Sequence, residues 1–139
     1  MGEGEATELA LRALRHRDRS RKDLEERLAR AGIPPEEREQ TLEELASAGL
    51  VSDDRFAQQR ARSLANRNAG DTLIRSDLRR HGIPDEVVAA ALEGLEPESE
   101  RAARIIERRG GGDRALRYLA GKGFARDSLE ALTAGDPLD

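Results

Sequence analysis

Apolar residues recur along the chain at the three- and four-residue spacing of amphipathic helices, and glycine-containing turns interrupt them. In the clearest stretch, Ile74 and Leu78 lie one helical turn apart on the same face. Gly82 suits the left-handed position after a helix end, Ile83 supplies the apolar residue that follows such an end, and Pro84 favours the start of another helix. This stretch therefore predicts two helices joined by a tight turn.

The same pattern occurs three times, which indicates a repeat protein. The glycines are 50 and then 41 residues apart, enough for three short helices per unit. We therefore predict an all-α fold of three tandem three-helix repeats, spanning residues 1–49, 50–96 and 97–139. The third repeat is the most degenerate. The positions that match are Leu24, Leu28, Gly32, Ile33 and Pro34 in the first copy, and Ala115, Leu119, Gly123, Phe124 and Ala125 in the third.

Two features mark places where the repeats divide or bend. Glu96-Pro97 interrupts the apolar pattern and predicts the boundary before the third repeat. The triple glycine at residues 110–112 predicts a flexible hinge within that repeat.

The first repeat begins with a helix predicted from Thr7 to His16. If that helix continued, arginines at helical spacing would extend a basic stripe along it. Ser20 and Asp23 resemble a capping box at the start of the second helix. Opposite charges four residues apart then predict a self-neutralised face on that helix, as in Arg21 with Glu25.

Composition favours an elongated stack over a sphere. The 139 residues are 37% hydrophobic, 37% charged and only 2% aromatic, which describes a thin core under a heavily charged surface. The chain has no cysteine, so a disulfide framework or a thiolate metal site is excluded. Its acidic first residues predict no signal peptide, and no apolar run is long enough for a membrane helix. We expect a soluble, cytoplasmic monomer.

Charge alternates along the chain even though the net charge is only −4. Residues 55–82 hold seven arginines and two aspartates, whereas residues 84–100 hold six carboxylates and no basic residue. The first and third repeats alternate in the same way. In each repeat, therefore, the first two helices are basic and the third is acidic.

The inventory for catalysis is small. The two histidines, His16 and His81, fall in different repeats beside arginines, and the glutamates occupy helix-surface spacings. We interpret His81 as a half-buried or helix-capping residue rather than a base. We therefore predict no enzyme, no catalytic residue, no cofactor and no metal.

Binding of anions is better supported. Arg75 and Arg79 are like charges four residues apart, and their repulsion is unfavourable unless nearby anions neutralise it. Asp71 and Asp77 could neutralise part of this charge, so a purely structural interpretation stays open. Arginine suits bidentate contacts with phosphate or carboxylate. The candidate binding residues are Arg60, Arg62, Arg67, Arg75, Arg79 and Arg80.

Residues 45–92 closely resemble the central segment of the RecX family of recombinase regulators. The resemblance rests on Gly49-Leu50-Val51, Arg55-Phe56-Ala57, Ile74-Arg75 and Gly82-Ile83, together with Asp53. The earlier segment around Ser20, Leu24 and Gly32-Ile33 resembles the first repeat of that family, and the third repeat fits mainly by position.

The resemblance implies an elongated, curved, right-handed-type array of three-helix units that lies in the groove of a RecA filament on single-stranded DNA. Members of the family restrain RecA in DNA repair and the SOS response by reducing filament growth, ATP hydrolysis and strand exchange. The candidate arginines would then face DNA or acidic protein, and the chain would bind single-stranded DNA only weakly on its own. The family motif residues Gly49, Asp53, Arg55, Phe56, Gly82 and Ile83 would serve folding.

Two other hypotheses remain. A helical-repeat adaptor would bind an unrelated protein through its charged helix faces, without any dependence on DNA or recombinase. Helix-turn-helix modules would bind duplex DNA, but the third helices are acidic and lack the residue mixture of a base-contacting helix.

Overall fold

The computed structural model describes residues 3–134, and all regular secondary structure in that range is α-helical. The described range holds nine helices, which confirms the all-α prediction. They are α1 (Glu3–Leu14), α2 (Arg21–Arg30), α3 (Pro35–Ser47), α4 (Asp53–Asn66), α5 (Asp71–Arg80), α6 (Asp85–Glu93), α7 (Glu98–Arg109), α8 (Gly112–Gly121) and α9 (Arg126–Ala134).

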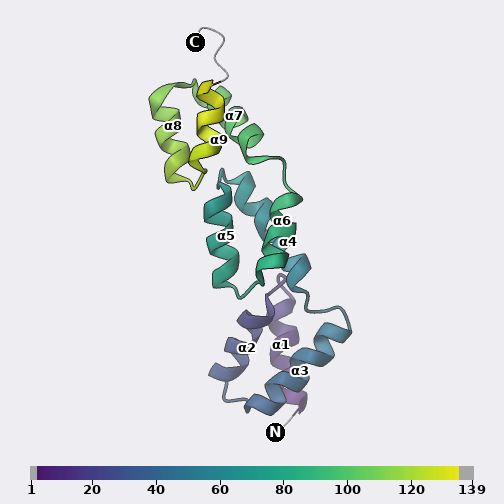
Figure 1. The fold of residues 1–139 in the computed structure, drawn as a ribbon. Coiled ribbons are helices and arrows are strands. Elements are labelled where there is room, and N and C mark those ends of the chain that lie inside the picture. The colour runs from purple at the N-terminus through teal and green to yellow at the C-terminus, as the bar shows by residue number, and fades with distance from the viewer. Residues whose placement is uncertain (1–2, 135–139) are drawn as a thin grey trace.

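The helices form three consecutive groups of three, stacked into an elongated array with α1 and α9 in the groups at opposite ends (Figure 1). Within the first group each helix packs on the other two, and the same holds for α4, α5 and α6. In the last group α7 packs on both α8 and α9.

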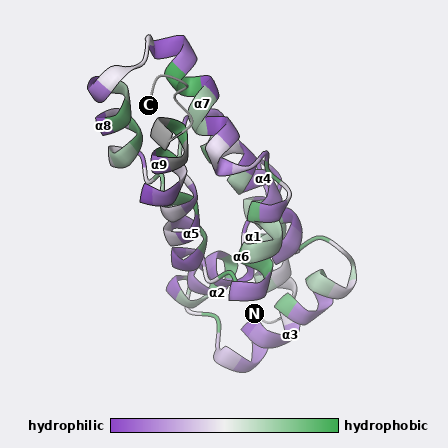
Figure 2. Ribbon diagram, turned by 45° about the horizontal axis from the view of Figure 1, so that its top comes forward, coloured by the Kyte–Doolittle hydropathy of each residue, from purple (hydrophilic) through white to green (hydrophobic). Residues whose placement is uncertain are grey.

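Each group encloses its own small hydrophobic core, as the leucine- and alanine-rich composition predicts. Leu24, Leu28 and Leu42 are almost fully buried in the first core, and Ile74 and Leu78 in the second. Hydrophilic segments run along most helices in Figure 2, with shorter hydrophobic segments between them. The third core is built around Ala102, Ile105, Leu119 and Phe124.

The predicted divisions of the chain lie near connections between groups. Val51, which we assigned to the second repeat, is buried in the first core just before α4 begins. The boundary at Glu96-Pro97 lies in the connection between α6 and α7. Glycines 110–112 connect α7 to α8 with positive φ angles of 87°, 75° and 79°, and whether they bend stays a prediction.

The first helix begins and ends earlier in the chain than the predicted range from Thr7 to His16. It begins at Glu3 and ends at Leu14, because Ala6, Ala10 and Ala13 form its buried face. Arg19 Nε donates to the carbonyl of Ala13 at 3.2 Å, which satisfies a free carbonyl at the helix end while the chain turns away. The basic stripe therefore does not continue past the helix.

The turn that recurs in the sequence is a Schellman motif. After α5, Gly82 has a φ of 76°, its N–H donates to the carbonyl of Arg79 at 3.0 Å, and Ile83 N–H donates to the carbonyl of Leu78 at 3.1 Å. The same pair of bonds follows α2, with Ile33 N–H on the carbonyl of Leu28, and α8, with Phe124 N–H on the carbonyl of Leu119. All three predicted turns are confirmed.

These turns also join the groups. The turn after α5 meets the start of α2, the middle helix of the first group, and the turn after α8 meets the start of α5, the middle helix of the second group. Gly70 N–H donates to the carbonyl of Lys122 at 2.8 Å, and Thr72 N–H donates to that of Gly123 at 3.1 Å. A Cβ atom on Gly70 would lie 2.4 Å from the carbonyl carbon of Gly123. The start of α5 is thus pressed against the turn after α8, backbone to backbone.

We predict that Gly70→Ser destabilises the protein by about 1–3 kcal/mol, because backbone atoms at this contact cannot move aside as a side chain could. Serine is otherwise a preferred N-cap residue, so local helix preference alone would predict no loss. Urea unfolding followed by circular dichroism measures the difference.

The matched control is Gly121→Ala at the end of α8, where an added Cβ meets nothing within 4 Å. This substitution should be neutral or stabilising by up to about 1 kcal/mol. Equal stability of Gly70→Ser and the unaltered protein would contradict the close contact.

Candidate functional site

Three arginines line a shallow hollow on the outer side of α5. Its volume is about 400 Å³, and the side-chain polar groups of its lining are three guanidinium groups and two hydroxyl groups. No carboxylate lines it, so it can receive an anion through several donors at once. The lining residues are Thr72, Arg75, Ser76, Arg79 and Arg80.

The three arginines of this hollow differ in how strongly the protein holds them. Arg75 has no ion-pair partner within residues 3–134. Arg79 meets the exposed Asp85 at 3.2 Å. Arg80, with 73% of its side chain exposed, meets Asp77 at 3.2 Å. The Arg79–Asp85 pair is exposed on both sides and contributes little stability, and Asp77 is already held by another arginine, so all three arginines can turn to an external anion.

Arg60 lies apart from this hollow in an internal ion pair. Its Nε and Nη2 donate to the two carboxylate oxygens of Asp77 at 2.7 and 2.8 Å, and only 6% of the Asp77 side chain is exposed. These hydrogen bonds hold the pKa of Asp77 below the usual aspartate value and raise that of Arg60. The structure therefore joins α4 to α5 through Arg60, and its head group is not free for an outside partner.

Arg62 lies on the exposed side of α4, and Arg67 is the exposed C-cap residue at its end. Arg67 Nη2 donates to Ser63 Oγ at 3.2 Å on its own helix. Arg62 borders a hollow that α4 forms with α7. The six predicted binding residues thus separate into three on α5, one on the outside of α4, one at the end of α4, and Arg60 in its pair with the buried Asp77.

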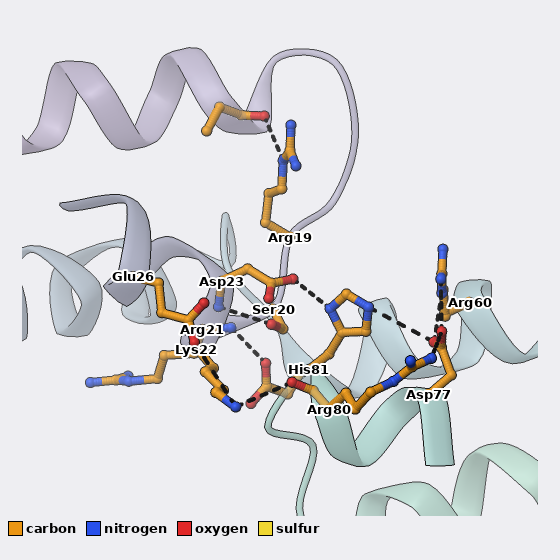
Figure 3. A network of polar contacts seen from close by, with 12 residues as sticks. Arg19, Ser20, Arg21, Lys22, Asp23, Glu26, Arg60, Asp77, Arg80 and His81 are labelled. Atoms are coloured by element: carbon orange, nitrogen blue, oxygen red, sulfur yellow. Dashed lines mark hydrogen bonds and ion pairs between the residues drawn. The ribbon is translucent and has the colours of Figure 1, made fainter. Parts of the chain in front are cut away.

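A chain of polar contacts crosses the joint between the first and second groups (Figure 3). His81 Nδ1 lies 2.8 Å from a carboxylate oxygen of Asp23, and its Nε2 lies 3.9 Å from Asp77, which in turn holds Arg60. His81 is the C-cap of α5 and is half-buried, as we predicted. Asp23 was expected to complete a capping box with Ser20, but only half of that box forms, because its carboxylate is directed to His81.

The family motif residues at this joint make internal contacts. Asp53 accepts the backbone N–H of Arg21 at 2.9 Å. Arg55 donates to both carboxylate oxygens of Asp18 and to the carbonyls of the turn after α3. Phe56 is buried, and its ring centroid lies 5.1 Å from that of His81.

Sequence reasoning missed the corresponding residues at the second joint. Glu98, the first residue of α7, accepts the backbone N–H of Asp71 at 2.6 Å, and its other oxygen accepts from Ala125 N–H and from Ser128. Arg101 is buried and donates to Asp71 and to the carbonyl of Ala69. The signal was available: Glu98 opens α7 just as Asp53 opens α4.

Among residues 3–134, no cluster of three or more histidine, aspartate or glutamate side chains has the geometry to hold a metal ion. Over the same residues, none of the helices combines the length and apolarity that a membrane crossing requires.

We predict that Asp77→Asn destabilises the protein by about 1–3 kcal/mol at neutral pH, since Arg60 then lacks its buried carboxylate. Because folding lowers the pKa of Asp77, the ion pair stabilises the protein above about pH 4 and loses this effect as the pH falls through the lowered pKa. The difference between variant and unaltered protein in urea unfolding should therefore shrink at acidic pH.

The exposed Glu8 in the loose pair with Arg12 provides a control, because Glu8→Gln should change stability by less than about 0.5 kcal/mol. A difference for Asp77→Asn that is as small as this, or that stays constant with pH, would contradict the buried ion pair.

Comparison with known proteins places this arrangement in a family. Residues 6–45 match the family model described as RecX, first three-helix domain, and residues 52–92 match RecX, second three-helix domain. These ranges correspond to the first and second groups of helices.

Similar proteins extend the match over nearly the whole chain. The regulatory protein RecX of Stenotrophomonas maltophilia strain R551-3 is 34% identical over 140 residues, covering 94% of this chain and 86% of that protein. The regulatory protein RecX of Halorhodospira halophila is 35% identical over 135 residues, covering 90% and 84%.

Solved structures show the same fold. A crystal structure of RecX from Lactobacillus salivarius superposes with a TM-score of 0.81 at 22% identity, covering 95% of this chain and 94% of that one. A crystal structure of a regulatory protein RecX has a TM-score of 0.78 at 25% identity, covering 95% and 73%. The chain therefore belongs to the RecX family of regulatory proteins.

Proposed function

We propose that this protein binds a RecA filament on single-stranded DNA and restrains it, lowering filament growth, ATP hydrolysis and strand exchange in DNA repair and the SOS response. One observation carries the proposal on the side of this chain: Arg75, Arg79 and Arg80 line a hollow on α5 without a carboxylate. Membership of the RecX family supplies the partner.

The shape and charge of the molecule suit such a partner. An elongated stack can lie along a helical groove, where it meets both DNA phosphates and charged protein surfaces. The arginines of α5 would face phosphate or acidic side chains. The exposed glutamates of α3, such as Glu36 and Glu44, would face basic protein.

The proposed role is binding rather than catalysis. His81 is engaged at a helix end with Asp23, and Asp77 is engaged with Arg60. We propose that the protein acts as a monomer and that its affinity for bare DNA is weak, since its net charge is −4. The protein then restrains RecA if it binds a less active state of RecA more tightly than an active state.

We predict that Arg75→Glu with Arg79→Glu weakens binding to RecA filaments at least about tenfold, because each lost charged hydrogen bond costs about 1 kcal/mol or more. The measurement is RecA ATP hydrolysis on single-stranded DNA at increasing amounts of the unaltered protein and the variant. The unaltered protein should lower hydrolysis, and the variant should need at least about ten times more protein to do so.

Arg12→Glu with Arg126→Glu is the matched control. It changes the net charge equally at exposed positions on α1 and α9, and both side chains are more than half exposed. This control should inhibit like the unaltered protein. Unchanged RecA hydrolysis and filament assembly with the unaltered protein would contradict the proposal and favour an adaptor that binds a different protein.

A further inference from the structure

A second arginine-lined hollow lies between α4 and α7, at the joint between the second and third groups of helices. Its volume is about 240 Å³. Arg62 and Asn66 enter it from α4, and Arg104 and Arg108 from α7. Glu96, in the connection before α7, contributes a carboxylate to the lining.

The charges in this hollow are not balanced internally. Arg104 Nη2 lies 2.6 Å from Glu96, so that carboxylate is already engaged. Arg101, at the buried end, is held by Asp71 and by backbone carbonyls. Arg62 and Arg108 have no ion-pair or hydrogen-bond partner in the part of the chain that the structure describes. Two guanidinium groups without an ion-pair partner among the described residues therefore border one hollow, and an external anion would stabilise this arrangement.

The hollow continues as a groove along α4. A neighbouring hollow of about 210 Å³ shares Arg62 and Leu95 with the first and runs between α4 and α6. Its remaining walls are uncharged and mostly small, with Gln58, Ala90 and Gly94 among them. The two adjoining hollows form one groove that offers a path for a linear anionic chain.

We propose that this groove binds phosphate groups of a single-stranded nucleic acid, with Arg62 and Arg108 as the main contacts. The proposal rests on the function proposed above and assigns a specific place on this chain, apart from α5, to its contact with the single strand. It shares no lining residue with the α5 hollow, so the two surfaces can act separately.

The walls favour a nucleic acid over an acidic peptide. A peptide backbone laid against Ala65, Ala90 and Leu95 would lose hydrogen bonds for its N–H and C=O groups. Sugar C–H faces can contact those apolar walls while arginine forks hold the phosphates. No aromatic side chain lines either hollow, so the groove would follow the backbone without stacking bases.

The test uses the full chain and a fluorescein-labelled oligothymidylate, followed by fluorescence anisotropy at low salt and over a salt series. Arg62→Glu with Arg108→Glu should weaken binding at least about tenfold. It should also reduce the slope of log affinity against log salt by about 1.4, since each single-strand phosphate contact contributes about 0.7. Both side chains are exposed, and circular dichroism checks that helicity is retained.

The control variant Arg12→Glu with Arg126→Glu should bind the oligonucleotide like the unaltered protein. Oligoglutamate of equal charge should fail to displace it. The proposal is overturned if the unaltered protein does not bind at low salt, if the groove variant keeps its affinity and salt slope, or if oligoglutamate displaces the oligonucleotide equally well.

Failure of this proposal can be told apart from failure of the proposed function. If the groove variant binds oligothymidylate normally while the unaltered protein inhibits RecA, only the groove assignment fails. If the groove variant loses oligothymidylate binding while the unaltered protein leaves RecA unaffected, only the RecA function fails.

Discussion

The free backbone N–H groups at the start of a helix need acceptors, and this requirement holds the array together. At the start of α5, the N–H groups of Gly70, Asp71 and Thr72 all donate to atoms of the third group of helices. At the start of α2, Arg21 N–H donates to Asp53 of the second group. The middle helices of the first two groups, α2 and α5, are therefore each completed by the group that follows.

This arrangement explains how a chain with so few large apolar residues can form an extended stack. Each group buries only a small core, so contact between groups depends on polar bonds with strict geometry. Asp53 and Glu98 serve as acceptors at equivalent places, and Gly70 permits the backbone approach that a side chain would block. Burying Glu98 is tolerated because three donors satisfy its two oxygens.

The same bonds decide which charges remain for partners. Arg55 and Arg101 are held in ion pairs at the joints between groups, and Arg60 is held in an ion pair between α4 and α5. Exposed arginines that no joint uses include those on α5 and those along the groove between α4 and α7. In the function that we propose, contacts with partners therefore fall to arginines that the repeat does not need.

Periodicity and turn chemistry were enough to predict the helices and their turns, because Gly82 and its counterparts act within one segment of chain. Partners distant in sequence could not be predicted in this way. Arg21 was expected to pair with Glu25 on its own helix, but it binds Glu39 and Glu43 of α3, which approach it only after folding. Arg60 looked like its exposed neighbours, and only the packing of α5 on α4 brings Asp77 to it.

Amide hydrogen exchange measured by NMR reports on the bonds that join the groups of helices. The N–H groups of Gly70, Asp71 and Thr72 should exchange as slowly as those inside helices, although they begin α5. The N–H groups of Glu36 and Glu37 in the first turn of α3 have no acceptor among residues 3–134 and should exchange fast. Equally fast exchange at both helix starts would mean that the units are not joined in solution and would contradict this account.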